Sequence, residues 1–202
     1  MAAFIQNDKL HSKSKSETVV WNKIKEKLVG RDIICYFRYP LYSSIGENKK
    51  EPYILLLDKE LGIIIIETKQ FTINNIENIQ DDKWEMKDYY IKYCNPKEEA
   101  EDYLYTIKSK FDKDRFLRNK IKGKYFIALP EITKLKWEEK RYGKIADELY
   151  IIFKDDFINN EFINKIMSQP STIETIHIKI TFKYGPYRIR SENLKNSILK
   201  RR

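Results

Sequence analysis

The sequence predicts an α/β fold in which a central mixed β-sheet is flanked by helices. Residues 54–57 (ILLL) and 63–66 (IIII) are uninterrupted apolar runs of strand length, separated by the turn sequence DKELG. Runs without polar alternation are typical of strands that are buried on both faces. Apolar residues also recur at helical spacing before residue 30 and after residue 95, which favours helices packed against such a sheet.

The first fifteen residues (1–15) are expected to form a polar lead-in. Ser16 then fits the N-cap of a helix that reaches Gly30, because a serine side chain can accept a hydrogen bond from the first backbone amides. Residues 32–42 are rich in β-branched and aromatic side chains and are predicted to form the first strand. The inward stripe of the helix would consist of Val20, Ile24 and Leu28.

Beyond the two apolar strands, residues 83–93 suggest an edge hairpin around Trp84. The pair Asn95 and Pro96 then predicts the start of a long helix, because asparagine caps helices and proline suits their first position. The remaining strands are expected at residues 124–129, 149–153 and 172–184, and a further helix at 155–167. The inward residues of these helices would be Ala100, Leu104, Ile107 and Phe111 in the first, and Phe157, Phe162 and Ile166 in the second.

A length of 202 residues suits one domain, divided here into a core at 16–130, an extension of the same domain at 131–186 and a basic tail at 187–202. The net charge of +9 favours a phosphate-rich partner. A coding bias toward lysine is the alternative explanation. Two distant cysteines argue against a disulfide or zinc site and fit the cytosol. No signal peptide is evident, and no apolar run approaches the ~20 residues that cross a bilayer.

Two charged residues, Glu67 and Lys69, stand at the end of the most hydrophobic segment of the chain. Because side chains alternate along a strand, both would lie on one face. A charge at such a place is costly unless it is paired, bound to a metal or used in a cleft. A carboxylate that holds Mg²⁺ beside a lysine for the scissile phosphate is the arrangement of a metal-dependent nuclease. A simple ion pair on one strand face is the alternative.

These residues resemble the PD-(D/E)XK nuclease superfamily and, within it, the nuclease-related domain called NERD. Glu67 and Lys69 match the Glu-x-Lys at the end of the second strand, and Glu17 matches a glutamate on the first helix. Trp84 and the segment 95–100 (NPKEEA) are similar to the family's tryptophan and Asn-Pro-x-x-Gln-Ala. The likeness runs from about residue 16 to about residue 111, with weaker support to Pro130. It implies a restriction-endonuclease-like core.

Two positions depart from the family pattern. Tyr53 stands where the family has its metal-binding aspartate, and Glu99 stands where it has glutamine. A phenol, with a pKa of roughly 10, is a poor Mg²⁺ ligand compared with a carboxylate. Glu51 would share the strand face of Tyr53 and could supply a substitute carboxylate. We therefore expect weak cleavage or none, and Tyr53→Asp should raise Mg²⁺ affinity and cleavage.

The resemblance implies a Mg²⁺-dependent DNA endonuclease, with Mn²⁺ as a possible substitute. Glu67, Glu51 and Glu17 are the expected metal ligands, and Lys69 would stabilise the phosphate or orient water. The expected nucleic-acid contacts are Lys69, Arg188 and Arg190.

One alternative is a catalytically degenerate nuclease fold that serves as a DNA-binding module. Another is an assembly module in a defence or repair system, with a helicase or another such protein as partner. No membrane association is expected. The ordinary roles of these residues also remain open: a first-turn helix residue for Glu17, a strand residue for Tyr53 and a solvated tail for residues 187–202.

Overall fold

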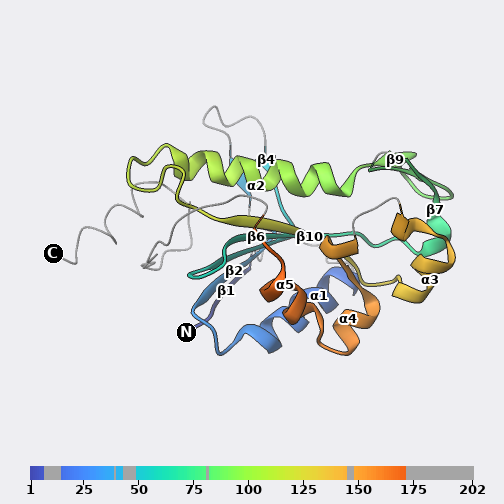
Figure 1. Cartoon of the computed structure of the whole chain (residues 1–202), viewed down its shortest axis with the longest axis horizontal. Coiled ribbons are helices and arrows are strands. Elements are labelled where there is room, and N and C mark those ends of the chain that lie inside the picture. The colour runs from blue at the N-terminus through green and yellow to red at the C-terminus, as the bar shows by residue number, and fades with distance from the viewer. Residues whose placement is uncertain (7–14, 39, 43–48, 81, 145–147, 172–202) are drawn as a thin grey trace.

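The computed structural model describes residues 1–6, 15–38, 40–42, 49–80, 82–144 and 148–171 (Figure 1). Its central sheet is mixed, as the sequence predicts. Strands β1 and β2 are parallel, β2, β5 and β6 are antiparallel to one another in turn, and β6, β10 and β11 are parallel. The strands run in the order β1 (Ala3–Gln6), β2 (Ile33–Phe37), β5 (Ile54–Asp58), β6 (Gly62–Thr68), β10 (Gly123–Leu129) and β11 (Ile151–Phe153).

Strands β5 and β6 are the two predicted apolar strands, and they form an antiparallel hairpin at the centre of this sheet. Their register pairs Ile54 with Ile66 and Asp58 with Gly62. Asp58 therefore belongs to the strand pair rather than to the turn alone. Its Oδ1 accepts hydrogen bonds from the backbone amides of Glu60 and Leu61 at 2.8 and 2.9 Å, which holds the tight turn.

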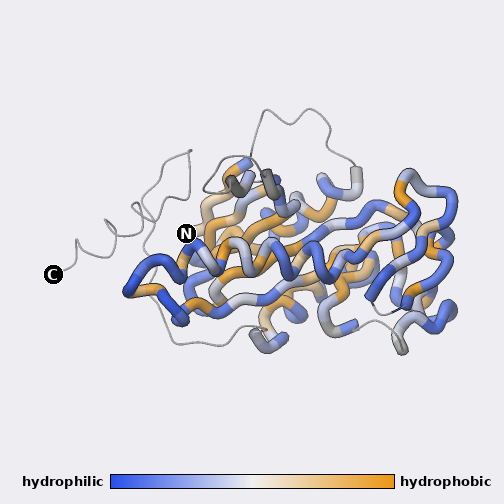
Figure 2. Tube along the Cα trace, turned by 90° about the horizontal axis from the view of Figure 1, so that it is seen from above, coloured by the Kyte–Doolittle hydropathy of each residue, from blue (hydrophilic) through white to orange (hydrophobic). Residues whose placement is uncertain are grey.

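Helices cover both faces of the sheet (Figure 1). Helix α2 (Pro96–Asp112) lies on one face, while α1 (Lys15–Leu28), α4 (Lys154–Ile158) and α5 (Phe162–Ser168) lie on the other. This two-sided cover explains the uninterrupted apolar strands, because alternate side chains of β5 and β6 enter different cores. The hydropathy of the trace shows the same layering, with largely hydrophilic turns of α2 above apolar strands (Figure 2).

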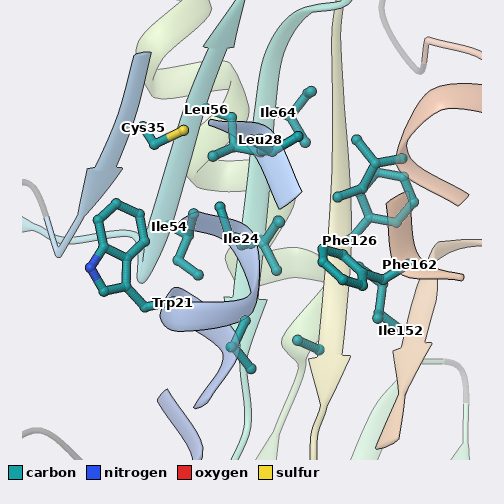
Figure 3. Packing of buried hydrophobic residues seen from close by; sticks show 14 of the residues in the cluster. Trp21, Ile24, Leu28, Cys35, Ile54, Leu56, Ile64, Phe126, Ile152 and Phe162 are labelled. Carbon is teal, nitrogen blue, oxygen red and sulfur yellow. The ribbon is translucent and has the colours of Figure 1, made fainter. Parts of the chain in front are cut away.

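A hydrophobic core lies between the sheet and α1, α4 and α5, and it extends along the sheet from β2 to β11 (Figure 3). Trp21 stacks on Phe37 with ring centroids 5.3 Å apart, and Phe157 packs on Phe162 at 5.1 Å. Burying side chains of this size contributes on the order of 1.5–3 kcal/mol each. The core residues that Figure 3 labels are Trp21, Ile24, Leu28, Cys35, Ile54, Leu56, Ile64, Phe126, Ile152 and Phe162.

Helix α2 begins as its sequence predicts. The side-chain oxygen of Asn95 accepts a hydrogen bond from the backbone amide of Glu98 at 3.1 Å, and Pro96 is the first helical residue. The predicted stripe is buried against the second face of the sheet, which fixes the rotation of the helix. The buried residues of this stripe are Ala100, Leu104, Ile107 and Phe111.

Short elements complete the described chain. A small sheet of three strands packs beside α3 through Trp84, whose ring centroid lies 5.4 Å from that of Trp137. The elements are β3 (Leu41–Tyr42), β4 (Lys49–Lys50), η1 (Ile73–Asn75), β7 (Ile76–Gln80), β8 (Lys83–Met86), β9 (Tyr93–Cys94), α3 (Lys134–Glu139), η2 (Tyr142–Lys144) and η3 (Glu148–Tyr150).

Several predicted boundaries were wrong. The expected polar lead-in contains strand β1, which gains its backbone partners from β2. Ser16 lies inside α1 rather than at its cap, and its Oγ donates to Glu131 Oε1 at 2.6 Å. The predicted hairpin around Trp84 is present as β8 and β9, and β8 in addition pairs with β7. The expected helix at 155–167 is two helices, because the chain turns at Asn160 with a φ of 62°.

The expected strand 32–42 ends at Phe37, where Arg38 takes a left-handed conformation, and β3 follows separately. The expected strand at 172–184 and the basic tail lie outside the described residues. Within the residues that the structure does describe, no helix is both long and apolar enough to cross a membrane.

Candidate functional site

The candidate site lies at the open end of the β5–β6 hairpin, away from its turn. The register that pairs Ile54 with Ile66 would next bring Tyr53 opposite Glu67. Opposite residues of an antiparallel pair have Cβ atoms roughly 5 Å apart. Tyr53 stands at the position where the resemblance places an aspartate. It is therefore a neighbour, in the fold, of Glu67, the glutamate of Glu-x-Lys.

Glu67 and Lys69 lie on the side of the sheet that α2 covers. Lys69 Nζ is 3.3 Å from Glu67 Oε1 and 2.6 Å from Oε2 of Glu99, a residue of the first turn of α2. Glu67 is 1% exposed, so its charge has little access to water. The lysine is thus held between two carboxyl groups, one on the sheet and one on the helix.

Burial raises the pKa of Glu67 to about 8, even though the ammonium of Lys69 works in the opposite direction. Burial by itself lowers the pKa of Lys69, but the carboxyl groups of Glu67 and Glu99 outweigh it and the net shift is upward. The pKa of Tyr103 on α2 rises to about 12 through burial and the same carboxyl groups. At neutral pH this side of the site therefore keeps protons on all three groups.

A second group of charges comes from the other face, through α1. Glu17 in the first turn of α1 is buried, and its Oε1 accepts a hydrogen bond from Gln70 Nε2 at 2.5 Å. Its Oε2 lies 3.8 Å from Nη1 of Arg38. The same guanidinium places Nε 3.5 Å from Glu51 Oε1. Arg38 thus contacts both Glu17 and Glu51.

Tyr53 connects these two groups. Burial raises the pKa of its phenol well above the ordinary value, and the charges of Glu17 and Glu67 raise it further, while Arg38 and Lys69 oppose them. Both carboxyl groups and both cations therefore influence the pKa of the phenol. It stays protonated at any physiological pH, so the position supplies a neutral oxygen instead of a carboxylate.

Glu17, Glu67 and Lys69, which the resemblance assigns to one active centre, make their contacts in two separate groups. All three gather at the same end of the sheet, but Glu17 arrives from the α1 face and contacts Gln70 and Arg38. Glu67 contacts Lys69 on the α2 face. Their roles in catalysis and in metal binding stay predictions.

Sequence reasoning missed two residues of this cluster. Gln70 directly follows the Glu-x-Lys motif, and that position was a signal that could have been used. Arg38 gave none, because its place depends on a backbone turn with a φ of 51° at the end of β2. Of the predicted nucleic-acid contacts, Lys69 is in the site, whereas Arg188 and Arg190 lie outside the described residues.

The residues present do not fit a two-carboxylate magnesium centre. In the described part of the chain, no three histidine, cysteine, aspartate or glutamate side chains are grouped so that they could hold a metal ion. A carboxylate is a far better Mg²⁺ ligand than a neutral phenol, and at position 53 the chain supplies a phenol whose pKa burial raises further. One feature of a ligand remains: Glu67 Oε2 is buried and has no hydrogen-bond partner among the described residues.

A comparison with protein families agrees with this geometry. The family model of the nuclease-related domain, NERD, matches residues 12–128, more than half of the chain. The match spans the α1 glutamate, the β5–β6 hairpin, helix α2 and most of β10. No curated protein and no solved structure matches the chain significantly. On the strength of the family match and the restriction-endonuclease-like α/β core, this chain belongs to the nuclease-related domain family.

Proposed function

We propose that this chain is a DNA-binding module built on a nuclease fold, and that its own cleavage of DNA is weak or absent. The observation that carries the proposal is Tyr53, a neutral phenol beside Glu67 and Glu17 at the position where a carboxylate would complete the centre. Without that second carboxylate, the site lacks the negative charge that is needed to hold Mg²⁺.

The DNA-binding part of the proposal is supported by the distribution of charge. Residues 172–202 contain eight Lys and Arg against two Glu, so they supply six of the nine net positive charges. Neutralising phosphates with such side chains releases counterions and drives binding to nucleic acid. The candidate site itself is different: the cations Lys69 and Arg38 are each held by glutamates.

A weak Mg²⁺-dependent endonuclease is the second candidate, and the orphaned Oε2 of Glu67 is the observation that favours it. Glu51 was expected as a substitute ligand. It is paired with Arg38, so the carboxylate is already neutralised in part. Mn²⁺ is the ion to test beside Mg²⁺, because both ions bind to oxygen ligands such as carboxylates.

The two candidates separate in one set of assays. The chain is incubated with supercoiled plasmid in EDTA, Mg²⁺ or Mn²⁺, and its binding to a labelled duplex is followed by fluorescence anisotropy. We expect binding in EDTA and little or no nicking with either ion. Robust cleavage that Glu67→Gln abolishes would establish the endonuclease instead. A chain that neither binds nor cuts DNA would leave a protein-assembly role.

A further inference from the structure

Arg38 lies where a metal-dependent nuclease of this kind would concentrate its ligands. Its guanidinium is 3.8 Å from Glu17 and 3.5 Å from Glu51, measured from nitrogen to carboxylate oxygen. Its Cζ stands 5.3 Å from the centroid of the Tyr53 ring. Two positions that the resemblance places in the centre, Glu17 and Tyr53, and the expected substitute ligand Glu51 therefore surround a single guanidinium.

The backbone holds this cation in place. Arg38 has a φ of 51°, a left-handed conformation that non-glycine residues adopt rarely. Its backbone amide donates to the carbonyl of Tyr53 at 2.8 Å, which continues the pairing of β2 with β5 by one residue. The side chain is 20% exposed. The turn at the end of β2 thus directs Arg38 over Tyr53 and into the cluster of carboxylates.

A fixed cation changes what the site can bind. Carboxylates that gather without a counter-charge repel one another and favour a divalent ion. Here the guanidinium already supplies positive charge to Glu17 and Glu51. It would therefore repel a divalent ion placed beside the same two carboxylates. Arginine keeps its charge at every physiological pH, so the effect is permanent.

We propose that Arg38 is a built-in cation that takes the place of the divalent ion in this centre. Glu17 and Glu51 are its counter-ions, and the Tyr53 ring is the surface on which it rests. The loss of the metal site then has two parts, the phenol at position 53 and the guanidinium at position 38. The sequence alone predicts that Tyr53→Asp raises Mg²⁺ affinity. With Arg38 in place, this single change would instead put a third carboxylate beside the guanidinium and create another ion pair.

This inference goes beyond the proposed function, and the two can fail separately. Weak cleavage by the parent chain needs only an incomplete centre. The proposed role of Arg38 states in addition which substitutions would complete the metal centre.

The test measures Mn²⁺ binding by isothermal titration calorimetry at pH 7.5. It uses the parent chain, Tyr53→Asp, Arg38→Gln and the double variant Tyr53→Asp/Arg38→Gln. The double variant should bind Mn²⁺ at least about tenfold more tightly than Tyr53→Asp alone, because ligand charge sets the affinity for hard cations. The parent chain and Arg38→Gln should show no resolved binding.

Two control variants make the comparison specific. Tyr53→Asp/Arg31→Gln has the same net charge as the double variant, but it removes the arginine that pairs with Asp58 at the turn end of the hairpin, 3.1 Å away. It should bind Mn²⁺ no better than Tyr53→Asp. Tyr53→Asp/Arg38→Lys keeps a cation at position 38 and should also bind poorly.

Thermal melts of all variants show which of them are folded. Equal Mn²⁺ affinity for Tyr53→Asp and the double variant would overturn the role of Arg38, as would a folded double variant that binds no Mn²⁺. If the double variant does not fold, Tyr53→Asp remains decisive, because tight Mn²⁺ binding by this variant with Arg38 in place would refute the proposal.

Discussion

The carboxyl group of Glu67 is subject to two opposing influences. The ammonium of Lys69 lies 3.3 Å away and favours the ionised form, while burial beneath α2 favours the neutral one. Burial is the larger effect, and the pKa rises to about 8. The group therefore binds a proton in the folded chain across a pH range in which the unfolded chain has already lost it.

The stability of the fold should accordingly fall as the pH rises from about 5 to about 8. Because the pKa of Glu67 is raised in the folded state from 4.5 to about 8, its contribution is complete below pH 4.5 and is lost through this window. The limiting slope for one proton is about 1.4 kcal/mol per pH unit. Urea unfolding at several pH values, for the parent chain and Glu67→Gln, measures it as the difference between the two.

Glu26→Gln is the control for that experiment. Hydrogen bonding to Lys27 and the charges of Lys23 and Lys27 lower the pKa of Glu26, so any effect of this group appears only as the pH falls below its ordinary range. Its profile between pH 5 and 8 should run parallel to that of the parent chain. A profile for Glu67→Gln that also runs parallel would mean that Glu67 is ionised in the folded state.

At the scale of elements, the β5–β6 turn depends on one glycine. Gly62 has a φ of +83°, and a Cβ there would lie 2.2 Å from the carbonyl oxygen of Lys122. That carbonyl also accepts a hydrogen bond from the backbone amide of Ile63 at 2.9 Å. It therefore cannot move away from a new Cβ without weakening this hydrogen bond. The close approach ties the turn to the residues that lead into β10.

Gly62→Ala should therefore destabilise the chain by about 2–4 kcal/mol, from left-handed strain and a backbone clash together. Gly30 is the matched site, since a Cβ at that position meets nothing within 4 Å. Gly30→Ala should be neutral or slightly stabilising, because it restricts the unfolded chain. Chemical denaturation of both variants compares them, and similar losses at the two glycines would contradict this account.

The elements also differ in how far their sequence predicts them. The β5–β6 hairpin and α2 follow from uninterrupted apolar runs and from the Asn95 cap, which are local signals. Strand β1 is only four residues long and becomes a strand by pairing with β2. Arg38 belongs to the site through a turn and through contacts with distant residues. Interactions of this kind are tertiary, so a pattern along the chain does not contain them.

At the scale of the whole molecule, charge is the property that the proposed function uses. Most of the net positive charge is carried by residues 172–202 of the sequence. Replacing both Arg188 and Arg190 with glutamine should weaken duplex binding at every sequence tested. It should also reduce the slope of log K against log salt by about 1.8, or ~0.9 for each phosphate that an arginine no longer neutralises.

Lys59→Gln/Lys134→Gln removes the same charge at two exposed lysines in the described part of the chain and is the control. Anisotropy titrations from low to moderate salt give the slopes. If the control lowers the slope as much as the arginine pair does, binding depends on net charge alone and these arginines have no special place in it.

The order of strands in the central sheet has a consequence for synthesis on the ribosome. Among the six described strands of this sheet, each adds to the edge left by the sheet strand before it, and none inserts between two others. The sheet can therefore grow as the chain emerges. The interval is longest at β6, which ends at residue 68, whereas β10 begins at residue 123. At bacterial to eukaryotic rates of about 5–20 residues per second, the apolar edge of β6 waits roughly 3–11 s for its partner. During that time it is the strand that a chaperone would have to shield from neighbouring nascent chains.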